Sequence, residues 1–127
     1  MEIERNIDIE AEMQTVLSTH MNAYCRPLPA QPELPCILVT QVGGTDLNHI
    51  DTFEVVLDSR AQTEEEASEY LRTAVGILRA EADAQTSALR FITVNTSGSW
   101  GSDPVRPDLA MCSARLRVVA HPETLEV

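Results

Sequence analysis

"TEEEASEYLRTAVGILRAEADA", residues 63–84, is the stretch with the strongest secondary-structure signal in the chain. Thr63, followed three residues later by Glu66, forms a capping-box pattern that predicts a helix start. Gly76 in the middle costs about 1 kcal/mol of helix stability relative to alanine, which indicates close packing against a sheet. The apolar residues recur at helical spacing and predict one buried stripe: Ala67, Tyr70, Leu71, Ala74, Val75, Leu78 and Ala82.

Three consecutive carboxylates, Glu64, Glu65 and Glu66, follow the predicted cap. Consecutive residues of a helix point in different directions, so these side chains do not converge on one ligand. Negative charge in the first turn also suits the positive end of the helix macrodipole. The triplet is therefore interpreted as part of the helix start and not as a metal site or an acid–base pair.

Strand patterns lie on both sides of this helix. Residues 36–42 and 50–61 are apolar or alternating, and Gly43-Gly44 between them indicates a turn or a bulge of an antiparallel hairpin. Two further strands are predicted at 89–96 and 109–121. Apolar residues spaced as in a helix predict another helix over 7–22, capped by Asn6 or Asp8.

The predicted order is helix–strand–strand–helix–strand–strand. It indicates an α+β fold: a two-layer domain with a four-stranded sheet, mostly antiparallel or mixed, and two helices on one face. The segment "CRPLPAQPELPC", residues 25–36, holds four of the seven prolines, so we expect a stiff connector from helix to sheet. Residues 1–127 form a single domain, with flexible ends at 1–6 and 122–127.

Composition excludes several classes of protein. The net charge is −11 and all nine basic residues are arginine, the opposite of the balance in nucleic-acid binders. The longest apolar runs fall short of the roughly 20 residues of a membrane span, and the acidic start does not resemble a signal peptide. We expect a cytosolic product with free thiols at Cys25, Cys36 and Cys112; a Cys25–Cys36 disulfide is the alternative.

Catalytic and cofactor motifs are absent from the sequence. It contains no phosphate-binding loop, no dinucleotide fingerprint, no H-E-x-x-H and no G-x-S-x-G. Histidines and cysteines do not stand at zinc-ligand spacing. We therefore expect no enzyme activity, no cofactor and no metal.

One polar segment between the last two predicted strands holds the only tryptophan, Trp100, together with Arg106 and two prolines. Trp and Arg are enriched among residues that dominate binding energy, and proline lowers the ordering cost of a loop. Docking on another protein is one interpretation of Trp100. Folding back over the sheet edge of its own subunit is the other.

The order of elements, with the segments "CRPLPAQPELPCILVT", "SRAQTEEEASEYLRTAV" and "SGSWGSDPVRPDLAMCSARLRVVA", resembles the tail terminator (tail completion, head–tail joining) proteins of long-tailed bacteriophages. The resemblance covers about residues 7–121. It rests on the order of the elements and on these segments, not on a catalytic fingerprint. It implies a structural protein of the virion, assembled in the host cytoplasm.

The resemblance also implies partners. Proteins of this family form a homohexameric ring at the head-proximal end of the tail tube, stop tube polymerisation and provide the surface that docks to the head. The implied partners are further copies of the chain, the tail tube protein and the head–tail connector or neck proteins. DNA would pass through the lumen without specific binding, and no membrane is involved.

Candidate interface residues follow from the residues themselves. Trp100 and Arg106 are expected to face a neighbouring ring. Arg115 and Arg117 on the last strand are expected to pair with glutamates of a neighbouring subunit, namely Glu64, Glu65, Glu66 and Glu69. The alternatives are another neck component, such as a head-completion or connector protein, or a small α+β ligand-binding domain or enzyme with the Trp100 loop as its lid.

Overall fold

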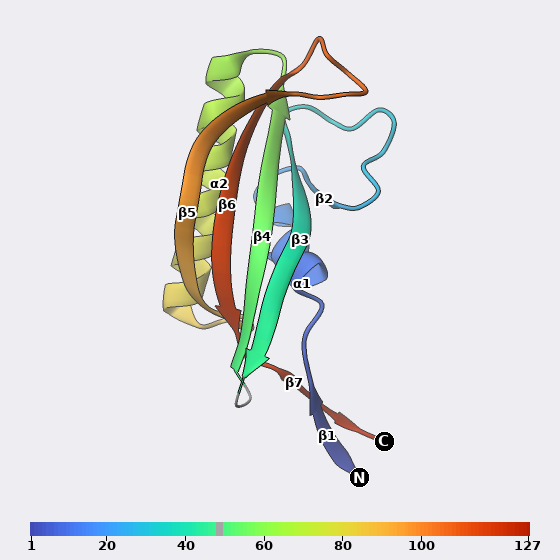
Figure 1. Ribbon diagram of the computed structural model, residues 1–127, viewed down its shortest axis with the longest axis vertical. Helices are drawn as coiled ribbons and strands as arrows, with labels where there is room; N and C mark the ends of the chain where they lie inside the picture. Colours follow the sequence, from blue (N-terminus) through green and yellow to red (C-terminus); the bar gives the residue numbers. More distant parts are fainter. Residues whose placement is uncertain (48–49) are drawn as a thin grey trace.

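The protein is seen in a computed structural model that describes residues 1–47 and 50–127 (Figure 1). Asn48 and His49, which belong to an expected loop, lie outside the described residues. In chain order the elements are β1 (Glu2–Arg5), α1 (Ile9–Ser18), β2 (Ala23–Cys25), β3 (Cys36–Leu47), β4 (Ile50–Ala61), α2 (Glu64–Ala84), β5 (Leu89–Ser102), β6 (Ala110–Ala120) and β7 (Glu123–Glu126).

The fold is α+β, with two helices and a mixed sheet, as expected. The main sheet has five strands in the order β2-β3-β4-β6-β5, and not four. The added strand, β2, runs parallel to β3, while the other neighbours are antiparallel. A three-residue strand next to a proline-rich segment has too short a pattern to be recognised in the sequence.

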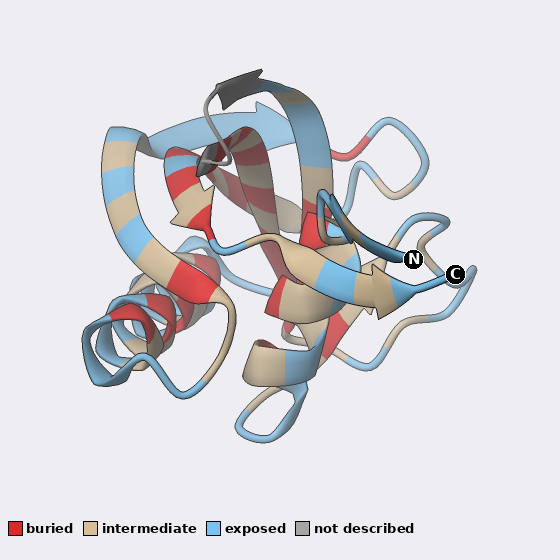
Figure 2. Ribbon diagram, turned by 90° about the horizontal axis from the view of Figure 1, so that it is seen from below, coloured by how far each residue is buried: buried red, intermediate tan, exposed pale blue. Residues whose placement is uncertain are grey.

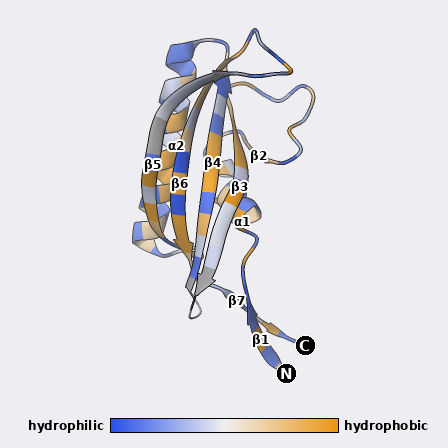
Figure 3. Ribbon diagram, viewed as in Figure 1, coloured by the Kyte–Doolittle hydropathy of each residue, from blue (hydrophilic) through white to orange (hydrophobic). Residues whose placement is uncertain are grey.

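Both helices cover one face of this sheet (Figures 1 and 2). Alternate residues of β4 and β6 point into the core between the layers, so buried and accessible positions follow one another along each strand. Figure 3 shows the matching alternation of apolar and polar residues. Neither α1 nor α2 lies on the opposite face of the sheet.

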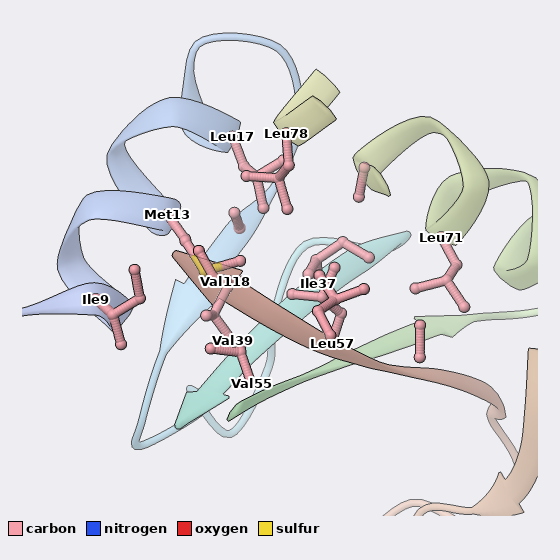
Figure 4. Close-up of a cluster of buried hydrophobic side chains, with 14 of the residues drawn as sticks. Ile9, Met13, Leu17, Ile37, Val39, Val55, Leu57, Leu71, Leu78 and Val118 are labelled. Carbon is pink, nitrogen blue, oxygen red and sulfur yellow. The ribbon is translucent and has the colours of Figure 1, made fainter. Parts of the chain in front are cut away.

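The core is aliphatic, as the low aromatic content predicts. In Figure 4, Leu71 and Leu78 of α2 and Met13 of α1 point toward side chains of the sheet. All three side chains are almost completely buried. The strands contribute further buried residues to the same cluster: Ile37, Val39, Val55, Leu57, Leu116 and Val118.

The start of helix α2 is the expected one. The Thr63 side chain accepts a hydrogen bond from the Glu66 N–H at 3.2 Å, and the helix ends at Gln85 in a left-handed conformation. Tyr70 and Val75 lie at the half-buried margin of the stripe. The expectation for Gly76 is wrong: it is exposed, and a Cβ added there would meet no atom within 4 Å.

Helix α1 is shorter than its pattern suggests. It spans Ile9–Ser18 within the expected 7–22, and its N-cap is Asp8, whose carboxylate accepts a hydrogen bond from the Ala11 N–H. The chain then turns and enters β2. None of the helices in the described ranges is long and apolar enough to cross a bilayer.

Strand β3 continues through the glycine pair. The expected strand ended at residue 42, but β3 reaches Leu47, and its register against β4 shifts between Gln41 and Gly43. Gly44 is required by close approach, because a Cβ there would lie 2.7 Å from the Thr52 carbonyl oxygen. The pair therefore marks a bulge within the ladder.

The segments expected to be flexible ends, 1–6 and 122–127, contain the strands β1 and β7. β1 and β7 pair antiparallel, with Ile3 opposite Leu125. The resulting two-stranded ribbon, here called the arm, projects from the body of the molecule (Figure 1). Segments this short and far apart in sequence carry no local sign that they pair.

Candidate assembly surfaces

Strand β5 is much longer than predicted and contains Trp100. The expected strand ended at residue 96 and placed Trp100 in a loop, but β5 reaches Ser102, and Trp100 lies opposite Cys112 of β6. Three register shifts and Gly98, which has a φ of 73°, let the strand bend while it stays paired. The sequence pattern failed here because a bulged strand does not alternate regularly.

The loop that remains, residues 103–109, is anchored by a buried ion pair. Arg60 at the end of β4 donates from Nε to the Asp103 carboxylate at 2.7 Å. Asp103 also accepts hydrogen bonds from the N–H groups of Val105 and Arg106. Leu109 closes the loop as a buried residue. One carboxylate therefore fixes both the start and the turn of the loop.

The charge of Asp103 is held by its surroundings. Burial, the largest single influence, raises the pKa of this carboxyl. The Val105 N–H, the Arg60 guanidinium and the Arg106 N–H together outweigh burial and lower the pKa below its ordinary value. Sequence reasoning missed the pair, because nothing local connects residues 43 positions apart.

Beside this ion pair lies a pocket of about 210 Å³. Its walls come from the proline-rich connector and the 103–109 loop, with Arg60 and Asp103 among the lining residues. Pockets that hold small ligands have volumes of about 300–1,000 Å³, so this one is smaller than most of them. The connector thus contributes to a surface as well as joining helix to sheet.

The two predicted docking residues lie near this end of the sheet but differ in exposure. Trp100 is 49% exposed on β5. Arg106 is half-buried in the loop and forms an ion pair with Asp108, with both nitrogen–oxygen distances at 3.1 Å. Arg106 is therefore occupied within its own subunit, whereas much of the Trp100 ring is available for contact.

Arg115 and Arg117 stand on the face of the sheet opposite α1 and α2. Both are exposed, and both reach Glu54 of β4: Arg117 Nε at 3.1 Å and Arg115 Nε at 3.7 Å from its carboxylate oxygens. Asn95 of β5 also donates to Glu54. Two guanidinium groups share one carboxylate here, so the cluster keeps a positive excess. Glu54 was missed because the sequence does not reveal which strands are neighbours.

The glutamates expected to meet these arginines lie in the other layer. Glu64, Glu65 and Glu66 are exposed in the first turn of α2. Glu69 forms an exposed ion pair with Arg72 of the same helix, with 2.6 Å between Glu69 Oε1 and Arg72 Nη1. Since α2 packs on the covered face of the sheet, the structure keeps the two predicted groups apart within one subunit.

Cys25, Cys36 and Cys112 are free, as expected, and Cys36 and Cys112 are buried. Burial raises the pKa of both buried thiols, which favours their protonated form. Among the described residues, no group of three or more His, Cys, Asp or Glu side chains is placed to hold a metal ion.

No known protein-family profile matches this chain, and no curated protein matches it in sequence.

Proposed function

We propose that the protein assembles as a homohexameric ring at the head-proximal end of a bacteriophage tail tube, where it stops tube polymerisation and presents a docking surface to the head. The observation that carries the proposal is the separation of charge between the two layers. Arg115 and Arg117 stand on the uncovered sheet face, and Glu64, Glu65 and Glu66 stand at the exposed start of the helix in the opposite layer.

The two groups carry opposite charges and lie on different surfaces of one subunit, so they suit a head-to-tail contact. A ring of identical subunits uses two different surfaces of each subunit, one for each neighbour. Groups of opposite sign on opposite layers provide such surfaces, whereas a two-fold dimer would place like groups near each other. Exposed ion pairs contribute about 0–1 kcal/mol each, so they would set the register while apolar contacts set the affinity.

The overall charge supports the same role. A tail lumen must let DNA pass without holding its phosphates, and a protein with net charge −11 repels them. The half-exposed Trp100 supplies a contact for the adjoining ring.

The test is electron microscopy of tails assembled with wild-type protein, without it, and with Trp100→Ala. Tails without the protein should have uncontrolled length. Trp100→Ala should leave the melting temperature nearly unchanged and yield tails of uncontrolled length or tails that fail to join heads.

A matched control is Val42→Ala on β3, since Val42 is exposed to 47% and lies away from the Trp100 end of β5. It should terminate tails normally. If tails made without the protein stop at the normal length, the proposed function is wrong. If Trp100→Ala unfolds while its remaining folded copies terminate tails normally, Trp100 belongs to the core of its own subunit.

A further inference from the structure

The arm has one strongly acidic face. Side chains alternate between the two faces of a strand. Four residues therefore share one face of the ribbon, three of them glutamates: Glu2, Glu4, Thr124 and Glu126.

Glu2 and Glu126 lie directly opposite each other in the ladder, and like charges in this position destabilise a strand pair. The Met1 amine nitrogen lies 3.0 Å from Glu126 Oε1 and places a positive charge beside this pair. The ion pair of Arg5 with Glu123 lies on the other face of the ribbon. A two-stranded ribbon is at best marginally stable in water. A cationic partner surface on the acidic face would stabilise it.

A groove with an excess of arginine runs between α2 and β5. In Figure 1 these two elements lie on the side of the molecule away from the arm. Its two adjoining parts, of about 360 and 200 Å³, share Arg79. Arg72 and Arg90 also line it, and Asp83 is the carboxylate among its described lining residues. Three of the nine arginines of a chain with 20 acidic residues thus gather on one groove.

Two of these three arginines already have partners within their own subunit. Arg72 pairs with Glu69, and Arg90 donates to the carbonyl oxygens of Ser87 and Leu89. Arg79 is exposed and makes no ion pair with any residue in the described ranges. Arg79 is therefore available to pair with a carboxylate of another molecule.

The same groove borders an open strand edge. Within the described residues, β5 pairs with β6 alone, so its outer edge offers unpaired backbone groups. Phe91 on β5 is 69% exposed beside the groove. An extended segment that binds here can add backbone hydrogen bonds and bury an aromatic ring.

We propose that the arm of one copy binds in the α2–β5 groove of the next copy, with its acidic face toward Arg72 and Arg79. The inference rests on the proposed ring. The arm and the two elements that line the groove, α2 and β5, lie on different sides of the subunit, as a head-to-tail contact requires. Charge complementarity selects a second copy as the occupant, because the chain itself supplies the matching acidic ribbon.

The experiment is a charge exchange read by sedimentation velocity at millimolar concentration and low salt. The arm variant is Glu2→Arg/Glu126→Arg, which keeps the like-charge pair across the ribbon. The groove variant is Arg72→Glu/Arg79→Glu. Each variant alone should self-associate several-fold more weakly than wild type, because each contact then joins like charges.

An equimolar mixture of the two variants should associate as wild type does. In an alternating ring with an even number of subunits, the basic arm meets the acidic groove, and the acidic arm meets the unchanged basic groove. Glu33→Arg, a charge reversal at an exposed position of the connector, is the control and should behave as wild type. Circular dichroism melts check that each variant folds.

Three results would overturn the proposal: wild-type protein that stays monomeric at millimolar concentration, folded variants that associate as wild type does, or a mixture of folded variants that does not recover association. Tail assembly separates this proposal from the proposed function. Association through arm and groove without any effect on tail length would reject the terminator role alone. Normal termination by both variants would reject the arm contact alone.

Discussion

Asp103 anchors the 103–109 loop through one buried carboxylate, and its removal should be costly. Asp103→Ala leaves the Arg60 guanidinium buried without a counter-charge, a loss of about 3–5 kcal/mol in the free energy of unfolding. Urea denaturation at neutral pH measures it. Asp108→Ala is the control, because its ion pair with Arg106 is exposed and should change stability little. If Asp103→Ala lowered the free energy of unfolding as little as the control does, the Arg60 guanidinium would be stabilised by water or by another group in the variant.

The same carboxyl makes stability depend on pH. Its pKa is lowered in the folded state, so the unfolded chain takes up the proton first as the pH falls. Asp103 therefore contributes its full stability above the ordinary aspartate pKa of about 4, and this contribution disappears as the pH falls through the lower folded-state value. The stability difference between wild type and Asp103→Asn should be constant from neutral pH to about 5 and shrink below about 4. A difference that grows on acidification would contradict the assignment.

Gly76 offers a stabilising substitution. It lies exposed inside α2, and a Cβ there would meet no neighbour, so Gly76→Ala should raise the free energy of unfolding by about 1 kcal/mol. Thermal and urea unfolding measure the gain. Gly44→Ala is the opposite case, because its Cβ would collide with the Thr52 carbonyl oxygen, and it should destabilise. A loss of stability in Gly76→Ala would mean that the backbone there is not free to accept a side chain.

At the scale of elements, the apolar stripe of α2 joins the two layers. Leu71 is 2% exposed within the core cluster, so Leu71→Ala should lower the free energy of unfolding by about 2–5 kcal/mol. Thr73→Ala, at an exposed position of the same helix, is the control for helix propensity. A loss below about half a kcal/mol would place Leu71 at an interface instead of in the core.

The elements differ in how well their patterns predicted them. α2 and β4 match their predicted ranges closely, because a capped amphipathic helix and an alternating strand are both local patterns. β3 and β5 both extend beyond the prediction, since bulges near Gly44 and Gly98 interrupt the alternation without ending the pairing. Of the turn and the bulge that Gly43-Gly44 indicated, the structure has the bulge, and Gly98 lies in a second one beyond the expected end of β5 at residue 96.

For the whole molecule, the negative charge predicts no measurable binding to duplex DNA at physiological salt. Nine arginines against 20 acidic residues leave no general attraction for phosphate. Fluorescence anisotropy with a labelled duplex tests this. Sub-micromolar binding that weakens steeply with added salt would show that a local group of arginines, such as that of the α2–β5 groove, outweighs the overall charge.

The sequence by itself determined the α+β class, the two helices, four of the strands, the aliphatic core and the acidic character. All of these depend on composition or on patterns within some 20 residues of chain, which report local propensity and burial. It also placed Trp100 and the two arginines of β6 among exposed residues.

Only the tertiary structure decided the strand order, the pairing of Arg60 with Asp103, the sharing of Glu54 by Arg115 and Arg117, and the arm formed by β1 and β7. The ion pairs and the arm join residues more than 40 positions apart, and many strand orders are compatible with the same local pattern. Register and neighbours are chosen by packing the whole domain at once. The surfaces on which the proposed assembly depends belong to this second group.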